Sequence, residues 1–302
     1  MNYIITNNKD FFNKIGVYSF CNLEDMVLPE TIGVDSETTS LSPLYGDMFA
    51  VQIGTGTNNY LIDMQSHNDG LDFKQVIPYL ENKKMVFHNA TFDLGFFYKH
   101  DFFPDKVFDT FLGSKLLYNG YPPYFKHNLG EVMERELGVV LDKSEQKNIH
   151  KVQLKTAKAI KYCFNDVDRL VELGRTLTTK LKNVGSLETF LIHCDYVKVL
   201  AYMEACGLPI SEQRWLEKMD NDQEELVSKK KVVVDYIYDN LPKYRDAQID
   251  MFSTEKQITV SLTSQQQMLP VFKDFGIKVL NKDFKESLKA DVISKSSHEF
   301  VE

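Results

Sequence analysis

The sequence is poor in the features that mark secreted and membrane proteins. Its 302 residues contain four cysteines, with no CxxC pair and no disulfide-framework spacing, so we expect reduced thiols in a cytosol-like compartment. No apolar run approaches the roughly 18 residues that a transmembrane helix needs. The start, MNYIITNNKDFFNK, lacks the basic and apolar stretches of a signal peptide. We therefore expect a cytoplasmic protein without a membrane span; its many Asn, Lys and Tyr residues fit an AT-rich genome such as a viral one.

The sequence also lacks an excess of positive charge. Lys and Arg number 35 against 43 Asp and Glu, which gives a formal net charge of −8. This balance argues against a general nucleic-acid coat protein. A local basic groove stays open, because charges are screened beyond about 10 Å at ordinary salt. The hydrophobic content of 43% is ordinary for a globular protein, and the length leaves room for about two domains.

The first half of the chain alternates strand-like and helix-like segments. We expect strands at 3–6, 31–37, 48–56, 58–64 and 84–89. The second, third and fourth are joined by short turns, which predicts an antiparallel meander. Helical patterns occupy 72–81, 90–99, 109–118, 128–137 and about 155–182. This order predicts an α/β fold with one mixed central sheet flanked by helices.

The pattern changes near Leu187. Apolar residues at helical spacing predict a buried helix that Gly207 and Pro209 end. A long charged helix is expected over about 211–241, followed by a tail with a short strand in ITVSL and small helices. We place a domain boundary between residues 185 and 186, so the regions are 1–185 and a mostly helical 186–302.

Two acids stand at strand spacing in GVDSETTSL (33–41). Because residues i and i+2 of a strand point the same way, Asp35 and Glu37 share one face. Taken alone, this pair is more typical of a solvated strand face than of a functional site.

Two further segments carry polar residues four positions apart. In VFHNATFDLGFF, Asn89 and Asp93 lie where a strand gives way to a helix; capping of that helix is the structural alternative. In KYCFNDVDRL, Tyr162 and Asp166 fall within roughly 40° of each other on a helix. Packing for the tyrosine and solvent exposure for the acid are the alternatives there.

Carboxylates gathered from separate segments repel one another unless positive charge lies among them. Hard oxygen ligands suit Mg²⁺ or Mn²⁺ better than zinc. Two such ions about 3.5–4 Å apart can clamp the attacking and leaving oxygens of a phosphoryl transfer. The hypothesis is therefore that the acids are metal ligands.

The three segments together carry a resemblance to a known family. DSE, then NATFD, then YCFND resemble the three motifs of the DEDD 3′–5′ exonucleases in their tyrosine form, whose fold is ribonuclease H-like. The stretches YIITNNKDFFNKI and NLGEVMERELGVVLDKSEQKN are similar to that family too.

The resemblance implies a role for each matching residue. Two divalent ions, Mg²⁺ or Mn²⁺, would be held by the four acids, which are Asp35, Glu37, Asp93 and Asp166. Tyr162 and Glu37 would orient the attacking water; a phenol with a pKa of about 10 is a poor base at neutral pH. Substrate contacts are expected from Leu41, Asn89 and Lys158, the last being near the Tyr162 face on a helical wheel.

The second half resembles the start of the polymerase part of family A DNA polymerases. VKVLAYMEACGLPISEQRWLEKM is similar to the segment that precedes their long thumb helix, and SLTSQQQMLPVFKDFGIKVL to the thumb itself. The family's polymerase motifs are not found. The resemblance implies a proofreading exonuclease for single-stranded DNA 3′ ends, with a polymerase domain or subunit as partner, from a split gene or an N-terminal fragment.

Two other functions are kept as alternatives: a ribonuclease D-like 3′–5′ RNA exonuclease, and a non-catalytic module that binds DNA or a polymerase. One feature is left open as either a solvated face or a phosphate-binding track. It is a lysine series, consisting of Lys143, Lys147, Lys151, Lys155, Lys158 and Lys161.

Overall fold

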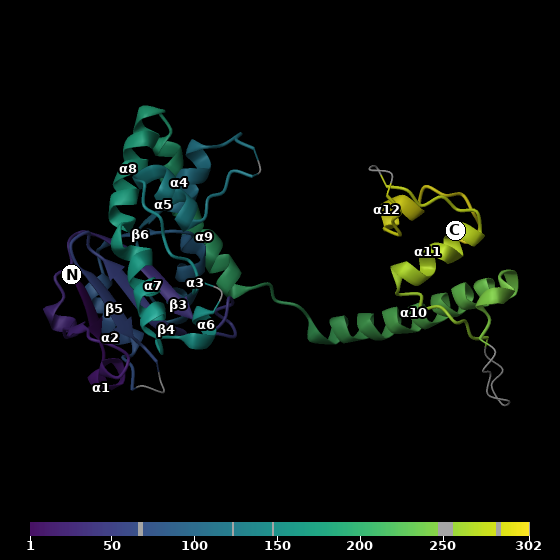
Figure 1. The fold of residues 1–302 in the computed structure, drawn as a ribbon, viewed down its shortest axis with the longest axis horizontal. Helices are drawn as coiled ribbons and strands as arrows, with labels where there is room; N and C mark the ends of the chain where they lie inside the picture. The colour runs from purple at the N-terminus through teal and green to yellow at the C-terminus, as the bar shows by residue number, and fades with distance from the viewer. Residues whose placement is uncertain (66–68, 123, 147, 247–255, 282–284, 302) are drawn as a thin grey trace. The chain divides into compact units, whose positions relative to one another are not determined.

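The computed structural model describes residues 1–65, 69–122, 124–146, 148–246, 256–281 and 285–301. The chain divides into two compact units, Met1–Leu208 and Pro209–Glu302 (Figure 1). The first unit contains the central sheet and is built around it.

The sheet has seven strands in the order β2-β1-β5-β4-β3-β6-β7. Their bounds are β1 Asn2–Ile5, β2 Ser19–Phe20, β3 Thr31–Thr38, β4 Met48–Gly54, β5 Asn59–Asp63, β6 Lys84–Phe87 and β7 Lys106–Asp109. The strands β3, β4 and β5 pair antiparallel, and all other neighbours are parallel. The predicted mixed sheet and its antiparallel meander are confirmed. The strands β2 and β7 were not expected from the sequence.

Helices cover both faces of this sheet (Figure 1). The helices of the first unit are α1 Lys9–Asn13, α2 Phe73–Leu80, α3 Ala90–Lys99, α4 Thr110–Leu117, α5 Leu129–Leu137, α6 Ile149–Val152, α7 Ala157–Asp168, α8 Leu170–Asn183 and α9 Leu187–Cys206, with a 3₁₀ turn at Leu23–Asp25. On one face, Val34 of β3 and Phe97 of α3 share a core cluster. On the other face, Leu61 of β5 packs with Ile160 of α7. Alternate residues of β5 therefore point into different cores, since its Ile62 belongs to the first cluster and its Leu61 to the second.

The prediction of one helix over 155–182 is wrong at Arg169, where α7 ends and α8 begins. Both helices lie on the same face of the sheet and contact β3. Apolar side chains therefore continue at helical spacing across the break. Such a pattern indicates which face is buried and does not show whether the hydrogen-bonded helix is continuous.

Two paired glycines set the distance between these helices and the sheet. Gly33 of β3 is the register partner of Gly54 of β4. A Cβ atom on Gly54 would overlap the backbone carbonyl of Val167, and one on Gly33 would lie 3.0 Å from Cβ of Leu170. The end of α7 and the start of α8 therefore rest directly on the backbone of β3 and β4. This contact places Asp166, the residue before Val167, over the strand that carries the two acids.

Helix α9 was correctly expected to be a helix with a buried stripe, and it packs within the first unit. Phe190, Cys194, Val197 and Ala201 are its buried residues. The Tyr98 hydroxyl of α3 donates to the backbone oxygen of Lys198, 3.0 Å away. The structure therefore divides the chain after Leu208, one helix later than the boundary that we expected after residue 185.

The second unit is built around the C-terminal part of a long helix. Its helices are α10 Glu212–Asn240, α11 Gln265–Asp274 and α12 Ala290–Ile293, with a 3₁₀ turn at Pro242–Tyr244. Ile237 is buried with Val271 and Phe272 of α11. Ser264 caps α11, and its side chain accepts a hydrogen bond from the backbone N–H of Gln267. Part of the predicted tail (247–255, 282–284 and 302) lies outside the described residues; in ITVSL, Ile258 makes a single β-bridge to Arg245.

The glycine contact gives a first prediction. Replacing Gly54 with alanine pushes Val167, and with it Asp166, away from β3. We expect Gly54→Ala to lower the free energy of unfolding by about 1–3 kcal/mol, as overpacking does, in urea unfolding. The control is Gly95→Ala in α3, whose Cβ would meet only Pro43 at an ordinary 3.4 Å; it should be neutral or stabilising by about 1 kcal/mol. Equal stability of Gly54→Ala and wild type would contradict the contact.

Candidate active site

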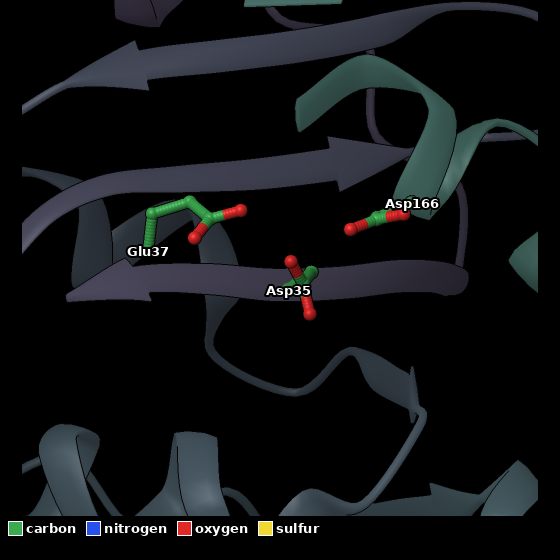
Figure 2. Close-up of side chains that lie close together, drawn as sticks. All are labelled: Asp35, Glu37 and Asp166. Carbon is green, nitrogen blue, oxygen red and sulfur yellow. The ribbon is translucent and has the colours of Figure 1, made fainter. Parts of the chain in front are cut away.

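Three carboxylates from two elements meet above the sheet. Oxygens of Asp35 and Glu37 on β3 and of Asp166 on α7 all lie within 4.8 Å of one another. Figure 2 shows the three side chains directed toward a common space. Glu37 is 7% exposed and Asp166 4% exposed, whereas Asp35 is partly exposed. The strand spacing predicted the first two neighbours, and the fold supplies the third.

The acids line a cleft of about 700 Å³. Asp93 of α3 lines the same cleft, is 2% exposed and accepts a hydrogen bond of 2.6 Å from the Ser36 hydroxyl. Its carboxylate is not part of the 4.8 Å group, within the portion of the chain that the structure describes. All four predicted acids therefore face one cleft, three of them in mutual contact range.

Burial and mutual repulsion disfavour the charged forms of these acids. Burial raises the pKa of Asp35 well above its usual range, and Asp93, Asp166 and Glu37 raise it further. The pKa of Glu37 is raised well above its usual range by burial and then by Asp166. Burial raises the pKa of Asp93 to about 7, against the hydrogen bonds from Ser36. The cluster therefore attracts positive charge.

A lysine that we had not assigned to the site supplies one such charge. The Lys143 ammonium lies 2.6 Å from Oδ1 of Asp166 and 5.1 Å from the ring centre of Tyr162. Lys143 belongs to the lysine series seen in the sequence, but it stands in the segment between α5 and α6, where no helical periodicity could place it. It is the cation that balances part of the acid cluster.

Tyr162 lies one helical turn before Asp166 and is 7% exposed. Burial raises the pKa of its hydroxyl far above the usual range, and Asp166, Glu37 and Asp35 raise it further. The phenol therefore stays protonated at neutral pH and acts as a hydrogen-bond donor, for which Asp166 is an acceptor.

Asn89 occupies the N-cap position of α3 in the left-handed region, with φ of 75°, and makes no capping side-chain hydrogen bond. The cap comes from Asp109 at the end of β7, whose carboxylate accepts from the backbone N–H groups of Asn89 and Ala90, both at 2.9 Å. Asp109 was missed in the sequence because β7 was missed. The Asn89 side chain instead lines the cleft.

The remaining predicted residues differ in whether they line the cleft. Leu41 is 88% exposed and stands at the rim of the cleft. Lys158 is exposed in the first turn of α7, near Asp142, and is not among the described residues that line the cleft. Lys158 lies one helical turn before Tyr162, at the exposed start of α7, and for this reason it does not line the cleft. Lys147 lies outside the described residues.

The donor set fits a hard divalent cation. Every candidate ligand is a carboxylate oxygen, and the group contains no thiol or imidazole, which is the chemistry of Mg²⁺ or Mn²⁺ sites. Asp35, Glu37 and Asp166 are close enough to share one ion.

This sheet and this acid cluster define a ribonuclease H-like exonuclease fold. The chain belongs to the 3′–5′ exonuclease family, whose family model matches residues 14–182. Among curated proteins, DNA polymerase I of Aquifex aeolicus is 28% identical over 252 residues, which cover 77% of this chain and 39% of that protein. The chain thus spans about two fifths of the length of this relative.

Solved structures with the same fold come from nucleases. Brucella melitensis NrnC superposes with a TM-score of 0.54 and 21% identity, covering 70% of this chain and 96% of that one. Escherichia coli RNase D, an exoribonuclease involved in structured RNA processing, gives a TM-score of 0.52 and 21% identity, covering 67% and 51%. Within the described ranges, no helix combines the length and apolarity needed to cross a membrane.

The ion pair of Lys143 with Asp166 generates a prediction about metal binding. Lys143→Gln removes a positive charge beside the acids, so we expect Mn²⁺ to bind more tightly in calorimetry. At an effective dielectric constant of 20, unit charges 4 Å apart interact with about 4 kcal/mol. An approximately tenfold tighter affinity for Mn²⁺ requires only about a third of this interaction energy. The matched control is Lys158→Gln on the exposed start of α7, which should bind Mn²⁺ like wild type. Unchanged affinity in Lys143→Gln would refute the electrostatic role.

Proposed function

We propose that this protein removes nucleotides from the 3′ ends of single-stranded DNA, as the proofreading exonuclease of a family A DNA polymerase. The observation that carries the proposal is the convergence of four acids from β3, α3 and α7 on one cleft, in a chain 28% identical to a DNA polymerase I. The family membership supports the direction of cleavage.

We propose that the acids hold two divalent ions, Mg²⁺ or Mn²⁺. The closest group of carboxylates consists of Asp35, Glu37 and Asp166. The Asp93 carboxylate also interacts electrostatically with Asp35. Asp35 is therefore placed to be a ligand of both ions. When bound, such ions activate water and stabilise the charge that develops on the phosphate oxygens. The Brucella NrnC has been solved with bound Mg²⁺, which supports this choice of metal.

The chain's own residues orient the reactants in this proposal. Once cations engage Asp166, the protonated Tyr162 hydroxyl turns its single O–H from that carboxylate to the attacking water, and the Glu37 carboxylate accepts a hydrogen bond from the same water. Lys143 lies at the same wall of the cleft, and its ammonium neutralises charge on the scissile phosphate once cations take over its role beside Asp166. Positioning of this kind contributes much of the acceleration in phosphoryl transfer.

Leu41 and Asn89 are proposed to contact the terminal nucleotide, Leu41 by apolar contact at the rim and Asn89 by hydrogen bonding. For Lys158 we propose a more distant phosphate contact outside the cleft. The region 186–302 is proposed to be a partial thumb that connects region 1–185 to a polymerase domain or subunit; the similarity to DNA polymerase I, which covers 77% of this chain, supports this. We also propose a cytoplasmic site of action.

An RNA substrate is the second candidate. The fold is shared with RNase D and with NrnC, which has been solved bound to pGG. We favour DNA because the sequence similarity runs beyond the exonuclease region of residues 14–182 into the second half of the chain. The presence of every expected acid argues against a module that only binds.

The function is tested by removing a metal ligand. The wild-type protein with Mg²⁺ or Mn²⁺ should shorten labelled single-stranded DNA from its 3′ end, and chelator should abolish this. Asp35→Asn should reduce the rate by about 100-fold or more, because it removes a ligand of an ion that contributes several kcal/mol. The matched control is Asp168→Asn on the exposed side of α7, which should cleave normally. Undiminished cleavage by Asp35→Asn would refute the site, and a strong preference for RNA would establish the second candidate.

Asn89 allows a separate test of substrate binding. Glycine adopts the left-handed conformation freely, so Asn89→Gly should unfold like wild type. It should still raise KM about 2- to 12-fold, the value of one hydrogen bond of about 0.5–1.5 kcal/mol. Asn89→Ala should show the same change in KM and lose a further 1–2 kcal/mol of stability or so. An unchanged KM in Asn89→Gly would exclude the contact.

A further inference from the structure

The segment that joins α4 to α5 is unusually rich in aromatic residues and extends beyond the helices that it connects (Figure 1). Tyr121 is 57% exposed and Tyr124 is 80% exposed. Two large aromatic rings that stay exposed on one loop do not contribute the stabilising free energy that their burial would give. We call the described residues of this segment, 118–122 and 124–128, the aromatic loop.

The aromatic loop is connected to the cleft by a continuous series of rings. Phe111 lines the cleft and lies 6.5 Å from the ring of His127. His127 is 5.5 Å from Phe125, and Phe125 is 5.0 Å from Tyr121. The imidazole of His88, also in the cleft, hydrogen-bonds the backbone oxygen of His127 at 3.0 Å. An aromatic surface therefore begins at the cleft and ends at the exposed Tyr121, and the exposed Tyr124 stands three residues further along the loop.

Arg135 of α5 holds this surface in place. Its guanidinium lies over the rings of Tyr118 and Phe125, at 4.7 and 4.4 Å. It also donates to the backbone oxygen of Lys126 at 3.1 Å and to the Ser114 hydroxyl at 2.8 Å. The loop is therefore fixed by a partly buried cation and hydrogen bonds, which preorganise the ring of Tyr121 through its contact with Phe125.

The charge around the rings suits a polyanion. The exposed Lys115 places its ammonium 4.9 Å above the ring of Phe111, and Lys126 is exposed on the loop itself. Of the acids on the adjoining α5, Glu136 is neutralised by Arg135 and by Lys180, the latter at 2.7 Å, whereas Glu131 and Glu134 are exposed to solvent. Aromatic rings interleaved with cations are the arrangement by which proteins bind single strands without reading sequence.

We propose that the aromatic loop is a stacking platform for nucleotides upstream of the 3′ end of a single strand bound in the cleft. Bases of the strand stack on Tyr121 and Tyr124, while Lys115 and Lys126 contact phosphates. The platform rests on the proposed function and adds to it a binding surface outside the catalytic cleft. Because the bases supply the interaction, DNA and RNA strands use it equally.

The test compares strand lengths and is made with Ca²⁺ in place of Mg²⁺ or Mn²⁺, which binds the same kind of oxygen ligands, and with strands whose 3′-terminal linkage is a phosphorothioate, so that strands are bound but cut slowly. Fluorescence anisotropy measures Kd for a trinucleotide, which reaches only the cleft, and for a strand of about 12 nucleotides, within the usual span of single-strand sites. We expect the double variant Tyr121→Ala/Tyr124→Ala to weaken binding of the long strand by at least about 5- to 150-fold, the worth of one of the two stacked bases that it loses. The trinucleotide should bind as to wild type.

Three controls make the result specific. Tyr196→Ala removes an equally exposed tyrosine (60%) from α9 and should change nothing. A long strand with abasic upstream positions should bind the double variant and wild type alike, because stacking needs the base. Long RNA should show the same loss as long DNA. In steady-state cleavage the double variant should raise KM for the long strand and leave kcat unchanged.

Different experimental results would contradict the stacking platform and the proposed function. If wild type shortens DNA but the double variant binds the long strand as tightly as wild type, the platform is wrong and the function stands. If the trinucleotide weakens as much as the long strand, the tyrosines act through the cleft and the platform is again wrong. If wild type neither binds nor shortens single strands, both are overturned.

Discussion

The close packing of the α7–α8 junction on two strands is the constraint on which the rest of the site depends. Gly33 and Gly54, paired across β3 and β4, leave no side chain between the sheet and the helices. The carbonyl oxygen of Val167 lies 2.2 Å from where a Cβ of Gly54 would be, so Asp166 is held against the strand that carries Asp35. A bulkier pair would lift the helix and separate the acids.

That packing brings like charges together at an energetic cost. Asp35, Glu37 and Asp166 meet within 4.8 Å where burial already disfavours charge. Acids whose pKa is raised on folding bind protons more tightly in the folded state, so without cations they destabilise the protein as pH rises past their usual range. Lys143 offsets part of this repulsion through Asp166. Rigid packing holds the three carboxylates close together, and their repulsion lowers the stability of the folded protein. Cations bound among them would remove part of this repulsion and so stabilise the fold.

Much of this architecture could be read from the sequence, and the failures have physical reasons. The alternation around Asp35 and the turn-separated strands correctly predicted the five inner strands of the sheet, because period two is a local signal; the edge strands β2 and β7 were missed. The break at Arg169 left no trace in the apolar pattern, since α7 and α8 bury the same face. Residues in irregular segments were the hardest. Lys143 and Asp109 act through the tertiary fold, the first by reaching Asp166 and the second by capping α3.

The charge of the chain explains why such a site needs more than its acids to hold a strand. With a net charge of −8, the protein as a whole repels nucleic acid, and the cleft adds four carboxylates to that repulsion. Cations bound among the acids, together with the neighbouring Lys143, make the charge positive only within the cleft. Stacking on Tyr121 and Tyr124 does not depend on net charge, since every base has an aromatic face. An aromatic platform next to an acidic cleft that holds cations therefore lets a negatively charged protein bind a negatively charged strand, with a salt dependence that comes from the phosphate contacts of Lys115 and Lys126.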